Sequence, residues 1–133
     1  MNWTRIALAG VAAGIVNWIS DFVMHGMVMK ATYERLSQVY TQTQANPVWF
    51  LLVAVTICLM AAILFARTRG SWAAGWKGGL SFGFFLGLIV FFTRFYDPLV
   101  VDGYPYYLAW CQGGIYMIDS LLAGAVIGSI LKS

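Results

Sequence analysis

The segment PVWFLLVAVTICLMAAILFA, residues 47–66, decides the fold class, because it is a continuous apolar run without a charged side chain. About 20 residues of α-helix are enough to cross the hydrocarbon core of a bilayer. Three further apolar stretches accompany it, so that the candidate spans cover residues 6–29, 47–66, 73–93 and 106–131. We therefore predict an all-α fold: residues 1–133 form a single transmembrane domain, a four-helix bundle with short loops.

The composition agrees with a membrane environment. Of the 133 residues, 61% are hydrophobic and 10% are charged, whereas a soluble domain carries about 25% charged residues. A charge at the centre of a bilayer costs about 2.5–3.5 kcal/mol on insertion scales, so a lipid-facing surface must be poor in charge. The first stretch is too long for the apolar region of a signal peptide, and we expect it to be retained as a span.

The distribution of charge predicts an orientation. The end that would hold both termini carries five basic residues and no acidic one: Arg5, Arg67, Arg69, Lys77 and Lys132. The opposite loops carry three residues of each sign: Lys30, Arg35, Arg94, Glu34, Asp97 and Asp102. Because short cytoplasmic loops are enriched in Lys and Arg, we predict cytoplasmic termini and a bacterial inner-membrane location. The net charge of +3 follows from this placement, and no nucleic-acid partner is predicted.

The first of the opposite loops has a helical pattern of its own. Tyr33, Leu36 and Tyr40 recur at helical spacing. This predicts a short helix over about residues 30–40 that lies at the membrane interface or extends the first span. Asn46 and Pro47 then form a typical helix start, with Asn46 as the cap.

Small residues recur at every fourth position of three spans, and these positions are predicted to pack helices. They are Gly10 and Gly14 in the first span, Gly75, Gly79, Gly83 and Gly87 in the third, and Ser120, Gly124 and Gly128 in the fourth. A helix face without side chains lets a second backbone approach closely. These glycine ridges serve one of two purposes: they pack the four helices together, or they dock a second copy or another membrane subunit. The predicted partners are therefore lipid and such a subunit.

Polar residues within the spans form the candidate ligand or ion site. Asn17, Asp21 and His25 are spaced by four residues and lie on one side of the first helix. The fourth span and the end of the third would bring further polar groups to the same half of the bundle: Gln112, Tyr116, Asp119, Ser120 and Arg94. Ionisable groups inside a membrane usually face the bundle interior or a wet cavity. This pattern predicts either a site for a proton, cation or small polar ligand, with Arg94 as the nearest counter-ion, or a structural hydrogen-bond network.

No cofactor, metal site or enzymatic activity is predicted. His25 is the single histidine. Binding of a haem or pigment through His25 is an alternative, but two histidine ligands from one chain are impossible. Cys58 and Cys111 are expected at different depths and do not form a Cys-x-x-Cys motif. The chain has no glycine-rich phosphate loop, Gly-x-Ser-x-Gly or His-Glu-x-x-His motif.

The pattern Asp21-x-x-x-His25-Gly26, followed by Tyr33-Glu34, resembles the small, uncharacterised bacterial four-span integral membrane proteins. The glycine-bearing segment at residues 81–87 and the glycine-rich last span extend the resemblance to most of the chain. It implies a four-helix membrane fold. It implies no chemistry, because that family has no assigned activity, and no functional residue is transferred.

Three functions follow as hypotheses. The leading one is a small membrane protein that acts by interaction, as an accessory subunit or a homo-oligomer, with a polar site that binds a small ligand or cation. The alternative is a proton- or cation-coupled transporter that uses Asp21 and Asp119. The third is a haem- or pigment-binding subunit that uses His25.

Overall fold

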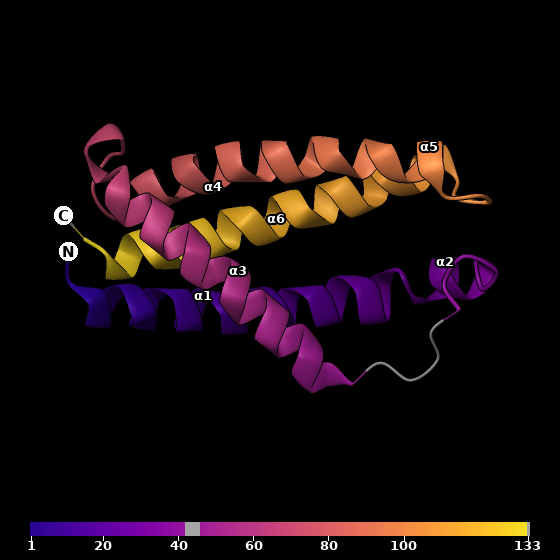
Figure 1. The fold of residues 1–133 in the computed structure, drawn as a ribbon, viewed down its shortest axis with the longest axis horizontal. Coiled ribbons are helices and arrows are strands. Elements are labelled where there is room, and N and C mark those ends of the chain that lie inside the picture. Colours follow the sequence, from indigo (N-terminus) through magenta and orange to yellow (C-terminus); the bar gives the residue numbers. More distant parts are fainter. Residues whose placement is uncertain (42–45, 133) are drawn as a thin grey trace.

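The computed structural model describes residues 1–41 and 46–132, and this part of the chain is helical without β-strands (Figure 1). Four long helices dominate it: α1 (Trp3–Val23), α3 (Pro47–Arg67), α4 (Gly75–Thr93) and α6 (Tyr106–Ile130). A π-helix, Met24–Val28, continues α1, and α2 (Lys30–Arg35) and α5 (Asp97–Val100) are short. Within the described residues, four helical stretches are long and apolar enough to cross a membrane: Trp3–Val28, Pro47–Arg67, Gly75–Val100 and Tyr106–Ile130. The predicted all-α, multi-pass architecture is confirmed at this level.

Asparagine caps fix the starts of two of these helices. The backbone N–H of Arg5 donates to Asn2 Oδ1 at 3.1 Å at the start of α1. At the start of α3, the N–H of Val48 donates to Asn46 Oδ1 at 3.0 Å, and Pro47 occupies the first turn. Proline is favoured there because the first helical N–H groups have no partner within the helix. The predicted start of the second span is therefore confirmed.

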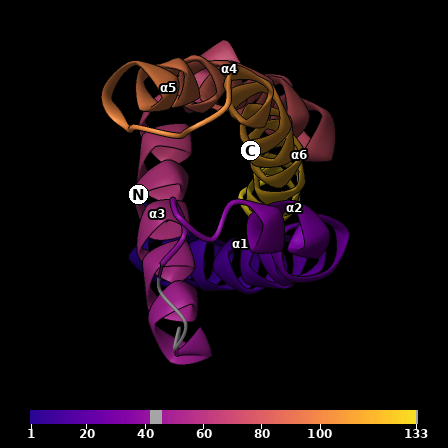
Figure 2. The same ribbon diagram turned by 90° about the vertical axis from the view of Figure 1, so that its right-hand side faces the viewer.

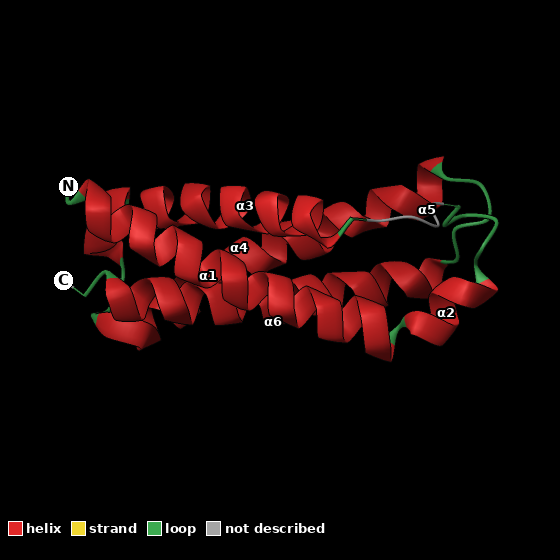
Figure 3. Cartoon of the chain, turned by 90° about the horizontal axis from the view of Figure 1, so that it is seen from below, coloured by secondary structure: helices red, strands yellow, loops and turns green. Residues whose placement is uncertain are grey.

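Successive long helices run in opposite directions, so both termini lie at one end of the bundle, and α2 and α5 lie at the other (Figures 1 and 3). The helix α4 packs along α6, while α1 packs against both α3 and α6. The helix α3 is tilted across the bundle, and its N-terminal end projects past α1 (Figures 1 and 2).

The glycine ridges are used inside the bundle. A Cβ atom at Gly79 or Gly83 of α4 would overlap a backbone carbonyl of α6, and one at Gly128 would lie 2.5 Å from the carbonyl oxygen of Gly75. On α1, a Cβ at Gly10 or Gly14 would lie 2.7 or 2.6 Å from a Cα atom of α3. The glycine ridges of α1, α4 and α6 are thus covered by this chain's own helices. A partner would have to contact another surface.

Gly75 differs from the rest of its predicted ridge. A Cβ at this position would meet nothing within 4 Å, but the backbone φ is +72°. This left-handed conformation at the start of α4 favours glycine, because an L side chain would be strained there. Gly75 is therefore required for its backbone conformation, and the prediction that its missing side chain makes room for a helix is wrong.

The interior changes character along the bundle. The half near the termini holds an apolar core of small and medium side chains: Ile6, Ala9, Ala13, Cys58, Ala61, Ala62, Phe65, Phe82, Ala123 and Ile127. At the opposite end, Met29, Leu108 and Ile115 form a second cluster, against which Tyr33, Leu36 and Tyr40 pack. The face predicted from their spacing therefore contacts the bundle, although the helix itself ends at Arg35. Among the described residues, the buried polar side chains of this interior are Gln112 and Asp119.

Candidate functional site

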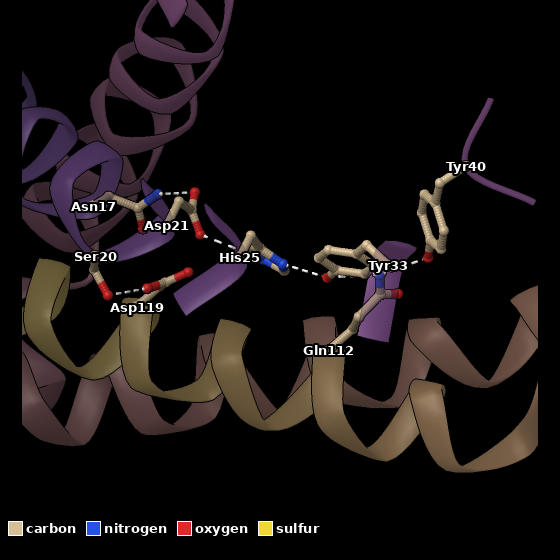
Figure 4. A network of polar contacts seen from close by, with 8 residues as sticks. All are labelled: Asn17, Ser20, Asp21, His25, Tyr33, Tyr40, Gln112 and Asp119. Carbon is tan, nitrogen blue, oxygen red and sulfur yellow. Dashed lines mark hydrogen bonds and ion pairs between the residues drawn. The ribbon is translucent and has the colours of Figure 1, made fainter. Parts of the chain in front are cut away.

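The first helix supplies one wall of the site. The Asn17 amide Nδ2 donates to Asp21 Oδ2 at 3.1 Å. His25 Nε2 lies 3.8 Å from Asp21 Oδ1, which is too far for a hydrogen bond (Figure 4). His25 belongs to the π-helix, and such wider turns are frequent at functional sites.

Asp119 is the buried partner of this group. It lies on α6 with 2% of its surface exposed, and the hydroxyl of Ser20, from α1, donates to its Oδ1 at 2.5 Å. Asp21 and Asp119 lie near enough for their carboxyl groups to influence each other electrostatically. Two ionised carboxylates have no hydrogen to share and repel each other. A single proton on the pair would remove this repulsion and would leave one negative charge.

Three polar atoms of this cluster are buried without a hydrogen-bond partner among the described residues: Asp21 Oδ1, His25 Nε2 and Asp119 Oδ2. The remaining oxygen of each carboxyl is satisfied by Asn17 or Ser20. An unsatisfied buried polar group costs about 1–3 kcal/mol, and more if it is charged. The cluster therefore keeps unused hydrogen-bonding capacity on three side chains that face one another.

A second polar group, centred on Gln112, continues the site toward the outer cluster. Gln112 is 7% exposed, and its Nε2 donates to the hydroxyls of Tyr40 at 2.7 Å and Tyr33 at 3.3 Å. Its Oε1 accepts a hydrogen bond from the hydroxyl of Tyr104. One buried amide thus holds three tyrosines, two of which come from the segment that follows the first span.

These bonds are compatible with a neutral His25. The Tyr33 hydroxyl accepts from Gln112, so its own hydrogen is free to be donated to His25 Nδ1, 2.5 Å away. A histidine that accepts at Nδ1 is neutral and carries its hydrogen on Nε2. That hydrogen points toward Asp21, so a line of polar groups runs from Gln112 to the buried carboxyl pair (Figure 4).

The tyrosines outside the spans remain protonated near neutral pH. Burial raises the pKa of Tyr33 from its usual value of 10.0 to about 12. Burial likewise raises the pKa of Tyr40 and that of Tyr104. Their hydroxyls are therefore neutral groups that donate and accept hydrogen bonds.

A cavity of about 500 Å³ lies beside this network. It is lined by Trp18, Asp21, Phe22, His25, Gly26, Tyr33, Tyr40, Pro47, Phe50, Gln112 and Tyr116. The side chains of Phe22 and Phe50 are 63% and 59% exposed, so the cavity opens between α1 and the projecting end of α3. Asp119 does not line it.

The structure brings together most of the predicted site residues, but two of them have other roles. Arg94 Nη1 lies 3.3 Å from Asp97 Oδ2, and its guanidinium stacks on the ring of Tyr116 at 5.3 Å. It is therefore the counter-ion of Asp97 and not of the intramembrane acids. Ser120 lies against Gly83 and Gly87 of α4 and belongs to the helix-packing face.

Several site residues were not predicted. Ser20 is one residue from Asp21 and was indistinguishable from any other small polar side chain of a span. Tyr33 and Tyr40 were recognised as one face of a helix, but their spacing carries no sign that they contact Gln112. The aromatic walls of the cavity, Trp18 and Phe50, look like ordinary lipid-facing side chains in the sequence.

The arrangement around His25 bears on the haem hypothesis. Its Nδ1 contacts the Tyr33 hydroxyl, and its Nε2 lies 3.8 Å from Asp21 Oδ1 without a hydrogen bond. Within residues 1–41 and 46–132, no cluster of three metal-ligating side chains was found. Cys58 is buried, Cys111 is exposed, and both are free.

Comparisons with family models, with curated proteins and with solved structures found no match to this chain. The functional argument therefore depends on the geometry of the site.

Proposed function

We propose that this chain is a small multi-pass protein of the bacterial inner membrane that binds a small amphipathic ligand in the cavity beside Asp21 and His25. The cavity itself carries the proposal. It places hydrogen-bonding side chains next to exposed aromatic ones, so a polar head and an apolar body would each find a matching wall. Its opening between α1 and α3 would admit such a ligand from the bilayer.

The charge distribution supports cytoplasmic termini, which would place the cavity in the outer half of the membrane. An enzymatic role has no support in the residues of the site. Assembly with a second copy or another subunit would use a surface other than the glycine ridges, because those ridges are covered by this chain's own helices.

A thermal-stability screen of small amphipathic compounds tests ligand binding. Gly26 lines the cavity, and a Cβ there would make ordinary contacts of 3.7 and 3.8 Å with Phe22. Gly26→Leu should therefore fill part of the cavity without forcing the backbone apart. Gly114→Leu is the matched control, since a Cβ at Gly114 meets nothing within 4 Å.

A true ligand should stabilise the wild type and Gly114→Leu but not Gly26→Leu. If no compound in the screen distinguishes Gly26→Leu from the other two proteins, the cavity is not a ligand site.

A second candidate function is proton- or cation-coupled transport, which the carboxyl pair favours. Asp21 lines the cavity, Asp119 lies deeper in the bundle, and each keeps one unpartnered oxygen. Purified protein in liposomes with an imposed pH gradient would show proton entry through a trapped pH-sensitive dye. Asp21→Asn and Asp119→Asn should abolish any such flux, and Asp102→Asn, in an exposed loop, should not. Flux that survives both substitutions would contradict this mechanism.

A further inference from the structure

The cavity is unusually aromatic for a site that contains an acid. Six of its lining side chains are aromatic: Trp18, Phe22, Tyr33, Tyr40, Phe50 and Tyr116. Asp21 is the only carboxyl among the lining residues, and neither lysine nor arginine lines the cavity. Aromatic faces carry negative potential and attract cations, most strongly where water is excluded. The aromatic walls and the carboxyl of Asp21 thus both favour a positively charged ligand.

The charged groups around the cavity do not oppose a cationic ligand. His25 adds no positive charge when the Tyr33 hydroxyl donates to its Nδ1, which the contact between them permits. Arg94, the nearest cationic side chain, is paired with Asp97 and covers one face of Tyr116 from outside the cavity lining. The carboxyl pair retains one negative charge when it shares a proton, and no basic side chain is hydrogen-bonded to it among the described residues.

An unpartnered oxygen strengthens the argument. Asp119 is 98% buried, and its Oδ2 has no hydrogen-bond partner although it lies beside Asp21. Negative charge on this pair can therefore be shared across two side chains, and among the described residues neither lysine nor arginine forms an ion pair with them. A negative charge kept in that state inside a membrane is expensive, and either a proton or a bound cation would relieve that cost.

We propose that the ligand is a lipophilic organic cation, a quaternary ammonium or comparable onium group with apolar substituents. Its charge lies against Asp21 among the aromatic rings, and its apolar part extends past Phe22 and Phe50 toward the lipid. This inference rests on the proposed function and specifies the ligand class. Inorganic metal ions fit less well, because Asp21 is the one carboxylate in the lining and a cation such as Ca²⁺ takes about six to eight oxygen ligands.

The test compares two ions of nearly the same shape and opposite charge, tetraphenylphosphonium and tetraphenylborate. Binding of each is measured to the full chain in lipid nanodiscs, with empty nanodiscs subtracted. The cation should bind saturably and the anion should not. Asp21→Asn should weaken cation binding by about ten- to hundredfold, the usual effect of removing a charged partner. Asp21→Glu should restore most of it, and the exposed-loop variant Asp102→Asn should leave it unchanged.

The aromatic wall is tested separately. Phe50→Leu should weaken cation binding by about two- to thirtyfold, as expected for loss of one cation–π contact. Phe92→Leu is the control, because Phe92 is 63% exposed on α4 and does not line the cavity.

Equal binding of the two ions, or cation binding that Asp21→Asn leaves intact, would overturn the inference. If neither ion binds but the compound screen finds a ligand sensitive to Gly26→Leu, the ligand class is wrong and the ligand site stands. If the screen also finds nothing, both proposals fail.

Discussion

Ser20 joins the first and last long helices at the point where the interior becomes polar. Its hydroxyl donates to Asp119 at 2.5 Å across the α1–α6 interface. Ser20→Ala would leave a buried carboxyl with one hydrogen bond fewer, and we expect a loss of about 0.5–2 kcal/mol in the free energy of unfolding. Ser81→Ala is a suitable control, because Ser81 is exposed and bonds only to its own helix. Denaturant unfolding in mixed micelles would measure both, and equal effects would show that the cross-helix bond adds no stability.

Tyr33 gives the site a predicted response to alkaline pH. Its pKa rises from 10.0 to about 12 in the folded protein, so the folded state holds the phenolic proton more tightly than the unfolded state. The resulting stabilisation is complete below pH 10 and is lost as the pH rises toward 12. Tyr33→Phe should therefore show a smaller loss of stability than the wild type between these pH values.

The measurement is the thermal midpoint at a series of alkaline pH values, with Tyr107→Phe as the control because Tyr107 is 50% exposed. If Tyr33→Phe loses stability as steeply as the wild type, proton retention by Tyr33 does not contribute.

Residue spacing in the sequence predicts which site residues lie together only when they belong to the same helix. Asn17, Asp21 and His25 share a face because four residues make about one helical turn, and the structure places all three in the network. Partners across helices depend on depth and rotation, which spacing does not determine. For this reason the predicted counter-ion Arg94 pairs with Asp97 instead, and Ser20 was missed.

At the scale of helices, the closest contact is between α4 and α6. A Cβ at Gly83 would overlap the carbonyl group of Ser120, so Gly83→Ala must push the two helices apart. We expect a loss of about 1–3 kcal/mol in unfolding free energy, the usual cost of overpacking. Gly114→Ala adds the same methyl group to α6 where nothing lies within 4 Å.

Unfolding of the two variants in a detergent titration would compare them directly. If Gly83→Ala proves no less stable than Gly114→Ala, the α4–α6 contact is looser than this structure places it.

Helix boundaries followed well from the sequence. The predicted third span, residues 73–93, is observed as α4, Gly75–Thr93, which ends where Arg94 follows the apolar run. The π-helix at Met24–Val28 was not predicted. It replaces the expected continuation of α1, and the residues around it carry no proline or other signal of a changed helical period. The tilt of α3, which opens the cavity, depends on how Gly10 and Gly14 seat Val55 and Leu59.

The unequal distribution of basic residues between the two ends of the bundle predicts which end faces the cytoplasm. Both termini lie at one end of the bundle (Figure 1), together with five basic residues and no acidic one. At the other end Arg94 is already paired with Asp97 at 3.3 Å, which leaves still less unpaired positive charge there. Since positively charged ends are retained in the cytoplasm, the end with α2, α5 and the cavity should face outward.

Two single cysteines, in a Cys111→Ala background, test this orientation without changing any charge. Val101→Cys is at the cavity end, where Val101 is 40% exposed, and Gly70→Cys lies in the exposed turn between α3 and α4, where an added Cβ meets nothing within 4 Å. A membrane-impermeant maleimide applied to intact cells should label Val101→Cys at once and Gly70→Cys only after the membrane is opened. The reverse pattern would place the cavity on the cytoplasmic side. A lipophilic cation would then reach Asp21 from inside the cell, so this labelling decides from which face such a ligand is taken up.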